Sequence, residues 1–327
     1  MANALVYHSE RLEPFLKKLR EELKETFAGC GKIAVKLHFG EPGNRTAFTP
    51  EQIRPITELL KGMGLEFFLF DTPVAYGGSV RNDIATYKKY AREKGWHSLG
   101  EVVIADDFVE VRGKDMTYQV SKQLAMAGGV LVVSHFKGHI CAGFGGAVKN
   151  LGMGAVTKKS KNDIHEGGKP VFSGKCSLCR KCENACPLGT LKVWDRPVFG
   201  ECYGCSDCSY ACLGGLIKPK VGTFDILLAG GANAAQSVFK KYYYVSFLSN
   251  ITQRCDCVRD AKKIIAKDCG FMASRDAVAI DAAARDVIVK SEGRDVFLEA
   301  NKKSGMEHVR EAERLGMGIS KYELAAV

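Results

Sequence analysis

The chain has 327 residues, of which 46% are hydrophobic and 26% are charged, as in an ordinary globular protein with two or three structural units. No apolar run approaches the roughly 20 residues that cross a bilayer, and the first residues show no secretory signal. Thirteen cysteines suit a reducing compartment. We therefore expect a cytoplasmic protein that does not bind membranes.

The formal net charge is +10, but Lys and Arg are spread along the chain and form no long basic block. This distribution makes nucleic acid an improbable partner. The excess of positive charge favours an anionic small molecule or an acidic electron donor or acceptor protein. A solvated basic surface explains the same charge without a partner.

The N-terminal half alternates predicted helices with predicted strands. Apolar residues at helical spacing predict a helix from Glu10 to Phe27, and alternating apolar residues predict a strand from Lys32 to Phe39. Thr49 and Pro50 open the next helix as N-cap and first residue. The later elements are strands at 65–70, 102–105 and 129–133 and helices at 80–94 and 117–127. Such alternation predicts an α/β fold, a mostly parallel sheet with helices on both faces.

Polar side chains follow the predicted strands, where the carboxyl ends of a parallel sheet bind ligands. Lys36 and His38 are two residues apart and share one face of their strand. His135, Lys137 and His139 follow the strand at 129–133, so all five are candidate catalytic or binding residues. For His38, a structural histidine is the alternative. Further polar strand ends are Asp71-Thr72, Asp106-Asp107, 249–252 and Ser274-Arg275-Asp276.

A glycine-rich run from Gly143 to Gly154 comes next. Its free backbone N–H groups could surround an anion or a cofactor, and the candidate residues are Gly143, Gly145, Gly146, Lys149 and Asn150. The order of residues matches neither a Walker loop nor a dinucleotide fingerprint. A plain glycine-rich turn is the alternative, and the sequence does not decide whether a flavin is bound.

The cysteines between Cys176 and Cys212 repeat one spacing twice, which is the ligand pattern of a two-cluster bacterial ferredoxin. In this pattern the fourth cysteine of each run binds the neighbouring cluster. One [4Fe–4S] cluster is therefore assigned to Cys176, Cys179, Cys182 and Cys212, and the other to Cys202, Cys205, Cys208 and Cys186. A zinc ribbon would use only four of the eight cysteines. Pro187 follows the first run as expected, whereas Leu213 replaces the usual proline after the second.

Alternation resumes after this cysteine-rich segment. The predicted elements are helices at 224–240, 276–290 and 306–315, with Ser274 as an N-cap, and strands at 242–247 and 270–272. The sequence thus predicts an α/β domain in two parts, 1–169 and 220–327, interrupted by a ferredoxin-like two-cluster insertion at 170–219.

Cys255 and Cys257 stand outside the ferredoxin pattern. A pair two residues apart could bind a further metal, act as redox thiols or approach a substrate. The alternative is a pair of buried apolar side chains. The charged neighbours Arg254, Asp256 and Arg259 argue against a fully apolar setting. Cys30, Cys141 and Cys269 are predicted to be core cysteines.

Five features occur in the order found in one known family. They are His135-Phe136-Lys137-Gly138-His139, the run from Gly143 to Gly154, the double cysteine pattern, Cys255-Asp256-Cys257 and the segment 274–281. Together they resemble the iron–sulfur proteins of the "domain of unknown function 362" family, which is common in anaerobic bacteria and archaea. The resemblance covers nearly the whole chain. It implies an α/β domain with a two-cluster ferredoxin module and specifies no reaction.

These features predict an iron–sulfur oxidoreductase. Electrons would pass through two [4Fe–4S] clusters to a small anionic substrate or second cofactor at the strand ends, where Lys36, His38, Lys137 and His139 position or protonate it. The alternative is a non-enzymatic electron carrier or redox-sensing partner protein. Nucleic-acid binding with structural clusters is a weaker third hypothesis.

Overall fold

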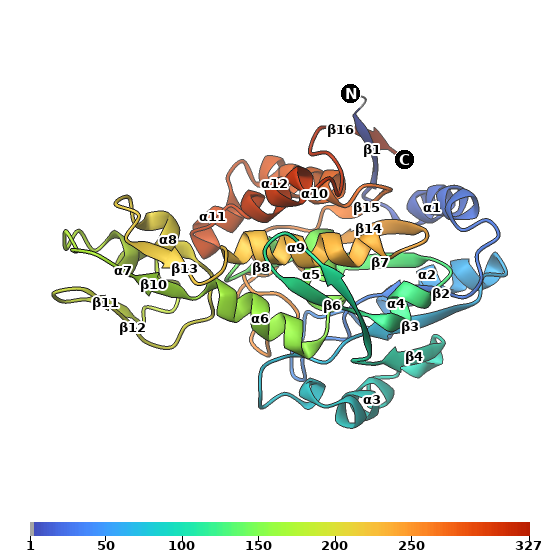
Figure 1. Cartoon of the computed structure of the whole chain (residues 1–327). Helices are drawn as coiled ribbons and strands as arrows, with labels where there is room; N and C mark the ends of the chain where they lie inside the picture. Colours follow the sequence, from blue (N-terminus) through green and yellow to red (C-terminus); the bar gives the residue numbers. More distant parts are fainter. Residues whose placement is uncertain (1–2) are drawn as a thin grey trace.

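The computed structural model describes residues 3–327, and its centre is an eight-stranded sheet (Figure 1). In spatial order the strands are β16 (Tyr322–Ala326), β1 (Ala4–Ser9), β15 (Gly270–Ser274), β14 (Tyr242–Leu248), β7 (Val130–His135), β2 (Ile33–Lys36), β3 (Phe67–Asp71) and β4 (Glu101–Ile104). Within the described residues, β15 alone runs antiparallel to its neighbours. The predicted α/β fold with a mostly parallel sheet is confirmed.

Two apolar cores cover the two faces of the sheet, because successive side chains of a strand point to opposite faces. In β7, Leu131 and Val133 join one core, and Val130 and Val132 join the other. The first core is closed by α1 (Leu12–Thr26), α2 (Pro50–Gly62) and α3 (Ile84–Glu93). The second is closed by α5 (Ala147–Gly154), α6 (Lys158–Gly168), α9 (Phe224–Ser237), α10 (Ala277–Glu292), α11 (Val296–Asn301) and α12 (Met306–Arg314). Across residues 3–327, no helix combines the length and apolar character that a membrane crossing requires.

The predicted helix at 117–127 is wrong in its first half. Residues Thr117–Ser121 form strand β6, which pairs with β5 (Phe108–Arg112), and only Lys122–Met126 are helical, as α4. The reason is an alternation of period two, since Tyr118 and Val120 are buried. A second short ribbon, β8 (Lys137–His139) with β9 (Gly143–Gly145), follows β7, and single turns of 3-10 helix lie at Val80–Asn82 and Trp96–Ser98.

Two expectations about the C-terminal half need correction. Because β15 is antiparallel, Ser274 and Asp276 lie at the opposite edge of the sheet from the ends of β2, β3, β7 and β14. The N-cap of α10 is Asp276, whose carboxylate accepts from the N–H groups of Val278 and Ala279 at 2.8 and 2.9 Å, and not Ser274. The Ser274 hydroxyl instead accepts from the Asp276 N–H at 3.1 Å.

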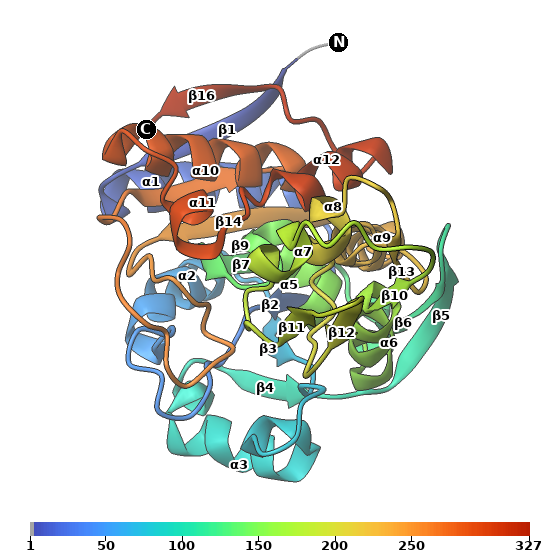
Figure 2. The ribbon, with the colours of Figure 1, turned by 90° about the vertical axis from the view of Figure 1, so that its left-hand side faces the viewer.

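Residues 170–219, called the lobe below, project to one side of the body in Figure 1 and face the viewer in Figure 2. Its first strand, β10 (Pro170–Phe172), pairs antiparallel with its last, β13 (Ile217–Pro219), so entry and exit lie side by side. Between them lie α7 (Lys181–Ala185), the ribbon of β11 (Leu191–Val193) and β12 (Pro197–Phe199), and α8 (Asp207–Ala211). The lobe has its own small core, in which cysteines pack with the apolar side chains of its short strands.

Candidate functional site

A pocket opens at the carboxyl edge of the sheet, where β2 and β7 end. We call it the strand-edge pocket. Eight predicted candidates line it, and Lys36, Lys137, His139 and Gly143 do not. The lining residues are His38, Val133, Ser134, His135, Gly145, Gly146, Lys149, Asn150, Cys255, Asp256 and Cys257. Of the eight, the strand-end rule supplied His38 and His135, and the glycine run and the cysteine pair supplied the other six.

Lys36 lies beneath the pocket and is fully buried. Its ammonium donates to Asp71 Oδ1 at 3.1 Å and to Asn150 Oδ1 at 2.9 Å. Burial would raise the pKa of Asp71, but Lys36 and the other bases around it hold that pKa below its usual range. Burial lowers the pKa of Lys36 despite the pull of Asp71. Lys36 thus fixes Asn150, whose amide nitrogen donates to Val133 O and Ser134 Oγ at 3.0 and 3.1 Å.

His38 is held as a neutral ring at the pocket wall. Its Nδ1 accepts from the Gly40 N–H at 2.9 Å, and its Nε2 lies 2.9 Å from the Arg81 guanidinium. Burial and the charge of Arg81 place its pKa well below the ordinary value. Arg81 itself is buried and paired with Glu41 at 3.1 Å and Asp71 at 3.7 Å. Both ring nitrogens of His38 are therefore engaged, and the ring stays uncharged.

Asp256 anchors the loop between the two pocket cysteines. Its Oδ1 accepts from Lys137 Nζ at 2.6 Å, and its Oδ2 lies 2.8 Å from His135 Nδ1. The remaining donors are also used, since Lys137 reaches Thr46 O at 2.6 Å and His135 Nε2 reaches Ser249 O at 2.7 Å. Burial would raise the pKa of Asp256, but His135 and Lys137 hold it below its usual range. The geometry makes Lys137 and His135 supports of this loop.

Cys255 and Cys257 are joined by a disulfide, with their Cα atoms 5.3 Å apart. A nitrogen of His139 and the two sulfurs lie within 4.8 Å of one another, which makes these residues a candidate metal group. The His139 Nδ1 accepts from the N–H groups of Cys141 and Ala142 at 3.2 and 3.1 Å. Burial keeps the pKa of His139 well below its ordinary value, so the ring is neutral and its proton is on Nε2.

The start of α5 is the part of the glycine run that was expected to receive an anion. Here the carboxylate of Asp281 already accepts from the N–H groups of Ala147 and Val148 at 2.7 and 3.0 Å. A Cβ at Gly146 would lie 2.1 Å from that carboxylate, so glycine is required there. Gly143 packs against Gly305, away from the pocket. The carboxylate of Asp281 thus occupies the N-terminus of α5, where an anionic ligand was expected.

Lys149 supplies the pocket with a cation. It lies on the first turn of α5, across Gly145, and its ammonium is 3.9 Å from Cys255 Sγ. Burial lowers the pKa of Lys149 to about 8, so the side chain remains mostly charged at neutral pH.

A second cavity lies in the lobe at its junction with the sheet. It is lined by the four cysteines assigned to one cluster, Cys186, Cys202, Cys205 and Cys208, together with Cys141 from the body. Cysteines of the other predicted set also lie together. Burial raises the pKa of Cys182, and the neighbouring Cys212 and Cys176 add to this rise. Cys186 therefore lies with the second cysteine run, and Cys212 lies near Cys182 of the first.

The two halves of the lobe repeat each other in backbone as well as in sequence. Cys176 accepts from the Leu178 N–H at 3.3 Å, and Cys202 accepts from the Gly204 N–H at 3.4 Å. Leu178 and Gly204 both have positive φ, of 57° and 71°. A Cβ at Gly204 would lie 2.0 Å from His165 O of α6, whereas Leu178 is half exposed. The second half therefore faces the body, and the first faces away.

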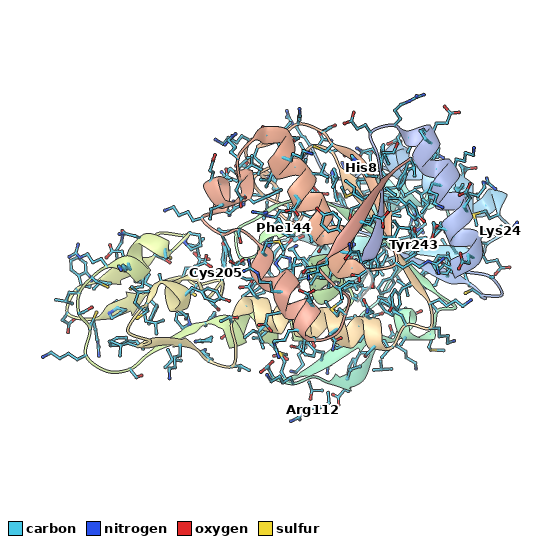
Figure 3. All side chains as sticks on the ribbon, turned by 90° about the horizontal axis from the view of Figure 1, so that it is seen from above. His8, Lys24, Arg112, Phe144, Cys205 and Tyr243 are labelled. Carbon is cyan, nitrogen blue, oxygen red and sulfur yellow. A yellow bond between two sulfur atoms is a disulfide. The ribbon has the colours of Figure 1, made fainter. Side chains whose placement is uncertain are left out.

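Lys303 connects the lobe to the pocket side of the sheet (Figure 3 labels Cys205 at this junction). Its buried ammonium donates to Cys141 O at 2.8 Å, to Cys205 O at 3.2 Å and to Asp225 Oδ2 at 2.7 Å. Cys141 N donates to His139, which adjoins the disulfide. A continuous set of contacts thus leads from the second cysteine run to the strand-edge pocket.

Sequence reasoning missed Arg81, Lys303 and Asp281 as parts of these sites. Arg81 and Lys303 lie in ordinary-looking charged segments, where exposure is the usual expectation. Asp281 was noted only as part of the resemblance, and no local signal shows that it caps α5 from a distant helix.

Comparison with known proteins places these features in a family. Residues 33–286 match the family model described as "Domain of unknown function (DUF362)". No curated protein matches. Among solved structures, a Thermotoga maritima protein has 10% identity and a TM-score of 0.45 over 94% of this chain and 60% of its own. The lactate racemase apoprotein of Thermoanaerobacterium thermosaccharolyticum has 13% identity and a TM-score of 0.36 over 75% and 50%.

Proposed function

Because this chain belongs to the DUF362 family, whose description names no activity, we propose from its own residues that it is an iron–sulfur oxidoreductase. The lobe holds two [4Fe–4S] clusters, which supply one-electron transfer when bound. The final acceptor is a small molecule, best matched by an anion, in the strand-edge pocket. One cluster uses Cys176, Cys179, Cys182 and Cys212, and the other uses Cys202, Cys205, Cys208 and Cys186.

The cysteine geometry supports clusters over zinc. Tetrahedral zinc–thiolate bonds of about 2.3 Å would bring four sulfurs within roughly 4 Å of each other. Within residues 3–327, the group of three or more ligand atoms that lie within 4.8 Å of one another is formed by His139, Cys255 and Cys257. It includes no cysteine of the lobe. The wider lobe sets, with backbone N–H groups donating to Cys176 and Cys202, suit a larger polynuclear centre.

The pocket residues suit a small anion. Lys149 offers a mostly charged ammonium, while the carboxylate of Asp256 is neutralised by Lys137 and His135. His38 is a neutral wall residue that is held between the Gly40 N–H and Arg81. Lys36 and Asn150 hold the ends of β2, β3 and β7 together below it.

One observation carries the proposal, and it is the bridge made by Lys303. Its ammonium donates to Cys205 O of the lobe and to Cys141 O of the body, and Cys141 adjoins His139, which lies beside the Cys255–Cys257 disulfide. A lobe that served only as a carrier would need no such buried connection.

The test is anaerobic purification followed by iron and sulfide analysis and EPR spectroscopy after reduction with dithionite. We expect roughly eight iron atoms per chain and two interacting reduced clusters. Cys212→Ala and Cys186→Ala should each remove a different cluster, because each residue completes the set of the other run. Bound zinc, or loss of the same spectral component in both variants, would contradict the assignment.

The alternative, an electron carrier that docks to another protein, is supported by the exposed apolar side chains of the lobe. Trp194 and Leu213 are 70% and 80% exposed. If it holds, Trp194→Ser should slow electron transfer to an acidic redox protein. Lys149→Met should leave that rate unchanged, because a carrier turns over no small molecule in the strand-edge pocket.

A further inference from the structure

We propose that Cys255 and Cys257 are a reversible dithiol–disulfide centre, which takes up two electrons in the strand-edge pocket before they reach the bound acceptor. The proposal rests on the proposed function for the source of those electrons. The geometry of the cysteine pair carries it independently, and a separate measurement tests it.

The disulfide is not a structural cross-link. It joins residues only two positions apart, and disulfides stabilise folds mainly by closing long loops. The surrounding loop is already fixed without it. Asp256 is clamped by Lys137 and His135, its backbone oxygen accepts from the Glu41 N–H at 2.9 Å, and the Cys257 oxygen accepts from Tyr76. Opening the sulfur–sulfur bond therefore leaves the loop in place.

The two sulfurs have different surroundings, as a working redox pair requires. Cys255 is buried, and its sulfur receives the Cys257 N–H at 3.4 Å and faces the Lys149 ammonium at 3.9 Å. These donors stabilise a thiolate at Cys255. Both cysteines line the pocket, but Cys257 is the less buried of the two, so it is the sulfur that meets the acceptor.

His139 distinguishes this role from metal binding. A histidine that binds a metal donates its other ring N–H to an acceptor. In His139 the Nδ1 accepts two backbone N–H groups, so the proton stays on Nε2, which then has no lone pair for a metal. The ring can instead donate a hydrogen bond. The close group of His139, Cys255 and Cys257 is thus suited to thiol chemistry.

The reaction balances with a one-electron donor of the iron–sulfur class. Two electrons enter the disulfide, the sulfur–sulfur bond breaks, and each sulfur gains one electron. Cys255 is released as a thiolate paired with Lys149, while Cys257 takes a proton from solvent. Two electrons are what two one-electron centres supply together, and they enter through the contacts of Cys205, Lys303 and Cys141 described above.

The experiment counts thiols on the peptide that contains Cys255 and Cys257. Anaerobic protein is alkylated and analysed by mass spectrometry, before and after reduction with reduced methyl viologen, while EPR follows the clusters. We expect the peptide to gain two alkyl groups when the protein is alkylated after reduction, and none when the reduced protein is reoxidised before alkylation. Cys30→Ser, a change outside the pocket, is the matched control and should behave as wild type.

Two variants sharpen the test. Cys257→Ser should keep the EPR spectrum and remove the two-thiol change. Lys149→Met should lower the alkylation rate of Cys255 at pH 7 by about tenfold, the effect of a one-unit rise in thiol pKa, and Lys149→Arg should restore most of it. An equal rate in Lys149→Met would overturn the role of Lys149.

Failure of this inference differs from failure of the proposed function. If the clusters are reduced but the peptide gains no thiols, the inference is overturned and the iron–sulfur assignment stands. If the protein contains no iron but dithiothreitol opens the pair reversibly, the centre is supported and the electron source is wrong. A further metal that is lost in Cys257→Ser would overturn the dithiol centre directly.

Discussion

Replacing Lys137 by methionine tests how the pocket loop is held. The Lys137 side chain is fully buried, and its ammonium is 2.6 Å from Asp256 Oδ1 and 2.6 Å from Thr46 O. Removing one partner of a buried pair costs about 3–5 kcal/mol, because the other charge is left without compensation. His135 still contacts the second oxygen of Asp256 at 2.8 Å, so we expect about 3 kcal/mol.

The assay is urea unfolding of anaerobic protein at pH 7. With a slope of about 3 kcal/mol per molar urea, the midpoint should fall by about 1 M. The matched control is Lys61→Met, which breaks an exposed pair with Glu58 of 2.9 Å. That pair should contribute below about 0.5 kcal/mol. A loss below about 1 kcal/mol in Lys137→Met, or an equal loss in both variants, would refute the reasoning.

Three further predictions concern charge and packing. Asp71 has a pKa held below its ordinary value, so the stability it contributes is present above about pH 4 and lost as pH falls further. In Asp71→Asn, the thermal unfolding midpoint should therefore depend less on pH below about pH 4 than it does in the wild type. Burial raises the pKa of Asp281 to about 7, so the folded state binds more protons than the unfolded state, and stability should fall as the pH rises from about 4 to 7. Asp281→Asn should remove this fall in the unfolding midpoint, and an unchanged fall would contradict the prediction. Gly204→Ala should cost at least about 2 kcal/mol more than Gly189→Ala, because both glycines have positive φ but only a Cβ at Gly204 meets His165 O, at 2.0 Å; equal unfolding midpoints would show that the lobe yields to the methyl group.

The parallel part of the fold was predictable because short apolar strands alternate with segments whose apolar residues recur every three to four positions. The same reading could not give strand direction. Nothing local in Gly270–Ser274 shows that β15 enters the sheet antiparallel, and this reversal carries Ser274 to the far edge. The first half of 117–127 was misread because Val120 and Leu124 are also four residues apart, which is helical spacing.

The candidate site was predictable where residues follow parallel strands. His38 and His135 line the pocket by the strand-end rule, and the cysteine spacing groups Cys186 with the second run. What the sequence could not show is which polar groups satisfy each other. The N–H groups at the start of α5 were predicted to receive a ligand, but Asp281, from another helix, occupies them.

The pairing of β10 with β13 makes the lobe a detachable appendage in topological terms. Since the chain leaves and re-enters the body through one narrow ladder, excision of 173–216 and closure by a tight hairpin turn would leave every strand of the central sheet in its order. The same ladder is an insertion point for a foreign module whose ends are equally close and which also covers Lys303 and His165, the body residues that contact the lobe.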